Sequence, residues 1–168
     1  MVDQQLAAQR SDIDQGMAKL RTSGSGDAAS ALQIPADKQA HFQAAYAAYT
    51  SGDQEKARGL FREYVTRYPD DAKAGDAQYW IGASYTQQSK PAAALGEYRK
   101  VIANFGKSAA VNVALFGMAD AFYQLHACTD AKAAVEALLK RKPDSALTTR
   151  TKKLRLDIER APKGYCTG

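Results

Sequence analysis

Hydrophobic side chains recur along the chain at the period of an α-helix, near 3.6 residues, on segments of about 14 residues. Short polar turns divide these segments into pairs, at Ser51-Gly52-Asp53, Gln88-Ser89-Lys90 and His126-Ala127-Cys128. Two helices joined by such a turn form a hairpin. The pattern therefore predicts three helical hairpins, over about residues 38–74, 75–111 and 112–144.

The three hairpins are copies of one another, offset by 37 residues. Small residues recur at Ala45, Gly82 and Ala119, and at Ala57, Ala94 and Ala131. Large apolar residues recur at Phe42, Tyr79 and Phe116, and at Val65, Ile102 and Leu139, and turn residues at Pro69, Gly106 and Pro143. We expect the small residue of each first helix to face the alanine twelve positions later, so that the two backbones approach closely. This packing would offset the cost of Gly82, about 1 kcal/mol in a helix interior.

The recurring positions resemble the signature of the tetratricopeptide repeat. They are Ala57, Phe61 and Pro69 in the first hairpin, Gly82, Tyr85, Ala94 and Tyr98 in the second, and Phe122, Ala131 and Pro143 in the third. The resemblance implies an all-α protein, a right-handed α-solenoid of three hairpins. The usual period is about 34 residues, so we place the extra residues between repeats, around Asp70 to Gly75. An unrelated helical bundle is the alternative.

The last hairpin of a solenoid needs a lid with a polar outer face. Residues 145–160 fit this role as a capping helix, with Leu147, Leu154 and Ile158 directed inward and a tail over 161–168. The net charge of +5 is concentrated toward this end. The basic residues there are either the solvated face of the capping helix or a surface for an anionic partner, and the capping role explains them without nucleic acid or lipid.

The N-terminal region differs from the repeats. Leu6, Ile13 and Leu20 recur every seven residues, which predicts a helix over 1–22 that is either a coiled coil or a lone amphipathic helix. A flexible linker follows over 23–34, with the run SGSGDAAS. The sequence has neither a membrane-spanning run nor a signal peptide, so an exported protein would have lost its signal already.

Catalytic patterns are missing from the sequence. His41 and His126 have no partner at helical metal-site spacing, and no nucleophile or phosphate-loop motif occurs. We therefore expect neither an enzyme nor a metal site, and no cofactor.

Cys128 and Cys166 are the two cysteines of the chain. The capping helix should run parallel to the first helix of the third hairpin, so that its end near Arg160 lies at the same edge as His126. Six further residues bring Cys166 within reach of Cys128, which predicts a disulfide, with two free thiols as the alternative. A disulfide would indicate an oxidising compartment.

The tetratricopeptide resemblance implies that the first helices of the hairpins line a concave groove for partner segments. The inward positions form a mainly aromatic wall with few charges, at Phe42, Tyr46, Tyr49, Tyr79, Trp80, Phe116, Asp120 and Tyr123. These residues are the predicted partner contacts. The alternative for Phe42, Tyr79 and Phe116 is a purely structural role between repeats.

The run AQYWIGASY, residues 77–85, resembles more narrowly the Tol-Pal-associated periplasmic tetratricopeptide proteins, the CpoB or YbgF family. Ala77, Tyr79, Trp80, Ile81, Gly82 and Tyr85 match its pattern, with Ala83 in place of a glutamate. The resemblance covers about residues 38–155. It implies a periplasmic protein that trimerises through its N-terminal helix and binds TolA and the peptidoglycan synthesis machinery during division.

Two other functions remain open at this stage. An adaptor similar to the outer-membrane assembly lipoproteins would carry a lipidated N-terminal cysteine and usually more repeats. A generic cytoplasmic scaffold would have no use for a disulfide.

Overall fold

The computed structural model describes residues 32–167 of the chain. Its compact part extends from Pro35, and residues 32–34 before it have no regular secondary structure. The helix predicted over 1–22 and most of the linker predicted over 23–34 lie outside the described residues.

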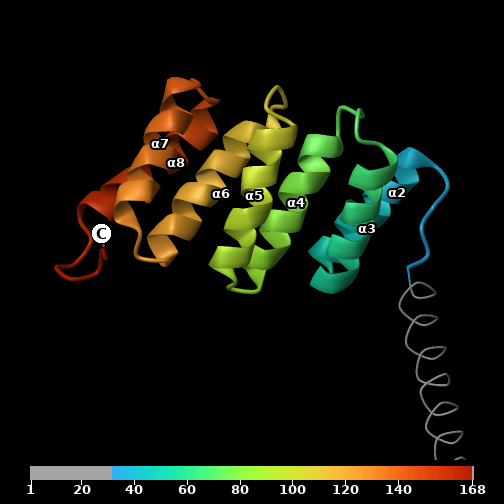
Figure 1. The fold of residues 1–168 in the computed structure, drawn as a ribbon, viewed down its shortest axis with the longest axis horizontal. Coiled ribbons are helices and arrows are strands. Elements are labelled where there is room, and N and C mark those ends of the chain that lie inside the picture. The colour runs from blue at the N-terminus through green and yellow to red at the C-terminus, as the bar shows by residue number, and fades with distance from the viewer. Residues whose placement is uncertain (1–31, 168) are drawn as a thin grey trace, which may run out of the picture. The chain divides into compact units, whose positions relative to one another are not determined.

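Every regular element in the described part is an α-helix, which confirms the predicted fold class. Figure 1 shows the helices in chain order from α2 to α7, with α8 overlapping α7 at the end of the row. They pair as hairpins of α2 (Lys38–Thr50) with α3 (Gln54–Arg67), α4 (Ala74–Gln87) with α5 (Pro91–Asn104), and α6 (Ala110–Gln124) with α7 (Cys128–Lys140), followed by α8 (Ser145–Glu159).

The first helices of the hairpins form the inner row of the stack. Helix α2 contacts α4, α4 contacts α6 and α6 contacts α8, whereas no Cα atom of α3 lies within 8 Å of α5, nor any of α5 within 8 Å of α7. Because the first helices lie closer together than the second helices, the row curves with the first helices on its concave side.

The turn inside each hairpin uses the same backbone conformation. Gly52, Ser89 and His126, one repeat apart, have φ of 90°, 55° and 64°. This left-handed conformation costs a non-glycine residue free energy. The third turn was predicted one residue too late: α6 ends at Gln124 and Cys128 is already the first residue of α7. Aligning the turns on the left-handed residue removes the error.

Aspartate side chains cap the starts of three helices. Asp37, Asp53 and Asp144 cap α2, α3 and α8 by accepting a hydrogen bond from the backbone N–H three residues on. The loop between α3 and α4 ends at Lys73, so Ala74 and Gly75, which were predicted in the loop, form the start of α4.

The predicted small positions lie in the core. Ala45, Ala57, Ala94, Ala119 and Ala131 are fully buried, and Gly82 is buried as well. The recurring large residues of the second helices, Val65, Ile102 and Leu139, are only half-buried. The residues one position earlier, Tyr64, Val101 and Leu138, fill the interior instead.

Gly82 makes room for an aromatic ring. A Cβ atom at Gly82 would lie 2.5 Å from Cε1 of Tyr98, and a Cβ atom at Gly117 would lie 2.6 Å from Cε2 of the same ring. Tyr98 is buried, and its hydroxyl lies 2.9 Å from Oγ1 of Thr86. The two glycines therefore flank one ring, and room for Tyr98 is a reason for Gly82 that was not predicted.

Helix α8 covers the end of the stack. Leu147, Leu154 and Ile158 are buried, while Lys152, Lys153 and Arg155 are exposed, as expected for a lid with a polar outer face. None of the helices in the described part has the length and hydropathy needed to cross a membrane.

Candidate functional site: an aromatic pocket on the concave face

Three aromatic side chains gather where α2 meets α4. The ring of Trp80 lies 5.0 Å from that of Tyr46 and 4.9 Å from that of Tyr49, measured between centroids. Tyr46 keeps 42% of its surface exposed. Neither the Tyr46 nor the Tyr49 hydroxyl forms a hydrogen bond within the described residues. The cluster thus presents apolar ring surface and free hydroxyl groups to solvent.

A pocket of about 430 Å³ opens beside this cluster, within the range of small-ligand and side-chain sites. It lies on the inner row of helices and is lined by Phe42, Tyr46, Lys73, Asp76, Tyr79, Trp80 and Val113. These residues come from α2, α4, α6 and the loop before α4.

Phe42 and Tyr79 belong to both the pocket and the core. The Phe42 ring packs edge-on against Phe61 at 5.5 Å and Tyr64 at 5.3 Å, and the Tyr79 ring stacks on Tyr98 at 5.6 Å. Burial raises the pKa of Tyr79. These two rings form the rigid floor of the pocket because the core fixes their orientation.

Asp76 supplies the negative charge of the pocket, from the first turn of α4. Burial raises the pKa of its carboxyl group, and the positive charge of Lys73 lowers it in part. The Lys73 ammonium lies 5.1 Å from the centre of the Phe42 ring. No hydrogen bond or ion pair joins the Asp76 carboxylate to another residue of the described part. The pocket therefore contains a partly desolvated carboxylate without a paired cation.

Asp71 fixes the edge of the pocket. Its carboxylate accepts hydrogen bonds from Lys38 of α2, from the Tyr64 hydroxyl at 2.8 Å and from the backbone N–H of Lys73 at 2.9 Å. These bonds, with Lys38 first, lower the pKa of Asp71 from 3.8 to about 2. Asp71 thus ties α2 and α3 to the residue that precedes α4.

The three remaining predicted contacts lie farther along the concave face, toward α8. The guanidinium of Arg150 covers the Phe116 ring at 4.5 Å. Asp120 accepts a hydrogen bond of 2.6 Å from the Gln124 side chain. Tyr123 donates its hydroxyl to the Asp157 carbonyl at 3.2 Å. The structure therefore brings Phe42, Tyr46, Tyr49, Tyr79 and Trp80 together but not Phe116, Asp120 and Tyr123.

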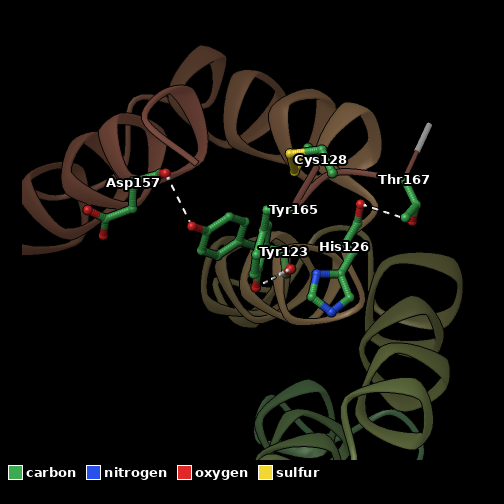
Figure 2. Close-up of a disulfide and its surroundings, with 7 residues drawn as sticks. Tyr123, His126, Cys128, Asp157, Tyr165 and Thr167 are labelled. Atoms are coloured by element: carbon green, nitrogen blue, oxygen red, sulfur yellow. Dashed lines mark hydrogen bonds between the residues drawn. A yellow bond between two sulfur atoms is a disulfide. The ribbon is translucent and has the colours of Figure 1, made fainter. Parts of the chain in front are cut away.

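The C-terminal tail covers Tyr123 (Figure 2). The Tyr165 ring lies 5.0 Å from the Tyr123 ring and 4.3 Å from the His126 ring, and the Tyr165 hydroxyl donates to the Tyr123 carbonyl at 3.2 Å. The predicted disulfide between Cys128 and Cys166 holds this arrangement in place.

The two histidines have structural positions. His41 is fully buried, with Nε2 2.8 Å from the Leu60 carbonyl, and His126 packs on Tyr165. In the part of the chain that the structure describes, no three potential metal-ligating residues come together.

The stacked hairpins and the pocket on their inner row define a helical-repeat protein. Family models, each described as a tetratricopeptide repeat, match residues 13–72 and 76–108. The chain is a tetratricopeptide repeat protein. Repeats of this class are protein–protein interaction scaffolds, and the matched models describe no catalytic domain. No protein of curated function matches the chain.

Three residues that line the pocket, Lys73, Asp76 and Val113, were not among the predicted contacts. Asp76 lies three residues before Tyr79, hence on the same face of α4, which is a signal that the sequence contains. Lys73 and Val113 reach the pocket from the preceding loop and the next repeat, so only the inter-repeat geometry reveals them.

Proposed function

We propose that this protein binds a segment of a partner protein in the pocket between α2, α4 and the start of α6. The observation that carries the proposal is the open aromatic surface of Tyr46 and Trp80 beside that pocket. Exposed aromatic side chains around a concave pocket are typical of surfaces that a partner covers. The family supports the same function, because its repeats bind proteins on their concave side.

Affinity capture from a cell extract tests the proposal. The bait is the full chain, immobilised as wild type, Tyr46→Ala, Trp80→Ala or Leu156→Ala. Leu156 is the matched control because it is 42% exposed, as is Tyr46, but lies on α8. We expect one set of proteins to bind wild type and the Leu156 variant and to be reduced on both pocket variants. Equal recovery on all four baits, each with a native circular dichroism spectrum, would contradict the proposal.

The finer proposal is that this protein works in the bacterial periplasm, in the Tol-Pal system that accompanies cell division, with TolA-like or peptidoglycan-synthesis proteins as partners. The match of residues 77–85 to the CpoB or YbgF family supports it. The bond between Cys128 and Cys166 supports an oxidising compartment. Thiol trapping in intact cells tests the location. We expect both cysteines to resist alkylation until a reductant is added, whereas two alkylated thiols would place the protein elsewhere.

The same resemblance supports trimerisation through residues 1–22, which lie outside the described residues. Light scattering on the full chain and on a chain that begins at residue 23 tests this proposal. We expect three copies for the first and one for the second. A single copy in both would contradict it.

A further inference from the structure

Three positions of the inner row lie one repeat apart and carry different chemistry. They are Asp76 on α4, Val113 on α6 and Arg150 on α8. Each of them is preceded in the inner row by a helix that carries an aromatic residue. These residues, Phe42, Tyr79 and Phe116, are also one repeat apart. The same geometric pair of positions therefore occurs three times along the concave face, with a carboxylate, an aliphatic group and a guanidinium in turn.

In the last of these pairs, Phe116 and Arg150, the arginine side chain covers the aromatic ring. The Arg150 guanidinium lies 4.5 Å from the centre of the Phe116 ring, within the distance of a cation–π interaction. Arg58 lies in the same way 4.4 Å over the Tyr85 ring, and it is buried. An arginine on an aromatic face is thus an arrangement that this fold already uses.

The first pair, Phe42 and Asp76, has the opposite charge at the second position, and a pocket lies beside it although Lys73 contacts the Phe42 ring. Asp76 takes the position of Arg150, and a pocket lies between it and the rings of Phe42, Tyr46, Tyr79 and Trp80. The Lys73 ammonium 5.1 Å over the Phe42 ring indicates that this ring attracts a cation. Burial raises the pKa of Asp76, so its ionised form gains from a cation placed beside it.

We propose that the pocket binds an arginine side chain of the partner segment, with the guanidinium stacked on the aromatic rings and paired with the Asp76 carboxylate. This inference rests on the proposed function of the pocket as a site for a protein segment. Arginine fits better than lysine, because a planar guanidinium stacks on a ring and donates two hydrogen bonds to one carboxylate. A glutamate in the segment would meet Asp76 as a like charge and be rejected.

A peptide titration tests the arginine inference. The probes are four capped peptides, acetyl-Gly-Ala-Leu-X-Leu-Ala-Gly-amide, in which X is arginine, citrulline, leucine or glutamate. Citrulline keeps the shape of arginine but not its charge. The reporter is the indole N–H signal of Trp80 in a nitrogen-15 NMR spectrum, which is unambiguous because the chain has one tryptophan. We expect saturable binding of the arginine peptide, and binding about tenfold weaker for citrulline because the charged pair is lost.

Three variants of the full chain complete the test. Asp76→Asn should weaken the arginine peptide about tenfold and leave the citrulline peptide unchanged. Asp130→Asn is the matched control, because Asp130 is also in the first turn of its helix but exposed on α7. Asp76→Arg should abolish binding, since the introduced side chain would cover the pocket as Arg150 covers Phe116.

Equal affinity for the arginine, citrulline and leucine peptides would overturn the arginine inference while leaving the segment-binding function standing. Absence of any shift at Trp80 would also overturn it. If Asp76→Asn fails to fold, the comparison of arginine with citrulline on the wild-type chain decides the matter. The capture experiment above tests the segment-binding function independently of these peptides.

Discussion

The concave face has an open half and a closed half, built from the same repeat positions. In the open half, between α2 and α4, the Tyr46 ring is 42% exposed beside a pocket of about 430 Å³. In the closed half, between α6 and α8, Arg150 covers Phe116 and Tyr165 covers Tyr123. The same helix face is thus covered or left open according to the residue that the next helix places over it.

We expect the largest single effect on stability from the disulfide of the closed half. It closes a loop between residues 38 positions apart, for which the expected contribution is about 4 kcal/mol. We expect Cys166→Ser to lower the free energy of unfolding by this amount in urea denaturation, since Cys166 is itself exposed and loses only the bond. Reductant should lower the wild type to the same value and leave the variant unchanged. A variant as stable as the oxidised wild type would show that α8 closes this half unaided.

Tyr98 lies at the boundary of the two halves, between Gly82 of α4 and Gly117 of α6. Gly82→Ala should lower stability by about 2 kcal/mol, because the new methyl group would overlap a ring that Gly117 flanks on its other side. Gly96→Ala is the control. No atom lies within 4 Å of its Cβ position, and it should gain up to about 1 kcal/mol. Equal effects of the two substitutions on the thermal midpoint would refute the ring contact.

Asp71 makes the open half sensitive to acid. Its pKa is lowered from 3.8 to about 2 in the folded chain, so its contribution is complete above about pH 5 and is lost as the pH falls through about 2. We expect Asp71→Asn to remove this part of the pH dependence of stability. The loss at pH 7 should be below about 1 kcal/mol, since Lys38 is half-exposed and the pair is screened by solvent. Parallel pH profiles of variant and wild type would argue against this role.

The smallest expected effect on stability is at the hairpin turns, where Ser89 is compared with His126 of the closed half. Ser89 is exposed and has a φ of 55°, so Ser89→Gly should gain about 0.5 kcal/mol by relieving backbone strain. His126→Gly should not gain, because it removes the ring contact with Tyr165 in the closed half. Thermal midpoints of the two variants measure this difference. A gain at both positions would mean that the contact with Tyr165 contributes nothing.

Much of the fold was predictable because it follows from periodicity. The 37-residue offset predicted the hairpins and the buried alanines, and the helical period predicted the inward residues of α8. The six residues between Arg160 and Cys166 are enough to reach Cys128, which predicted the disulfide. One detail required coordinates. Val65 lies beside Tyr64 on the same helix, and apolarity alone does not tell which of two neighbouring residues faces the interior.

The site was predictable only in part, because it depends on what covers each residue. Sequence analysis grouped Tyr46 with Tyr123 as aromatic residues of one face, but α8 and the tail cover only the second. It passed over Asp76, since a carboxylate near a helix start normally serves the helix dipole. Its position in the pocket becomes visible once α2 and α6 are placed beside it.

The most direct test of the open and closed halves is site-specific photo-crosslinking. Benzoylphenylalanine replaces Tyr46 in one full-length chain and Tyr123 in another, and both are irradiated in the same cell extract. The account predicts covalent adducts with partner proteins at position 46, and at position 123 none beyond those of an unirradiated sample. Adducts at position 123 together with none at position 46 would contradict it.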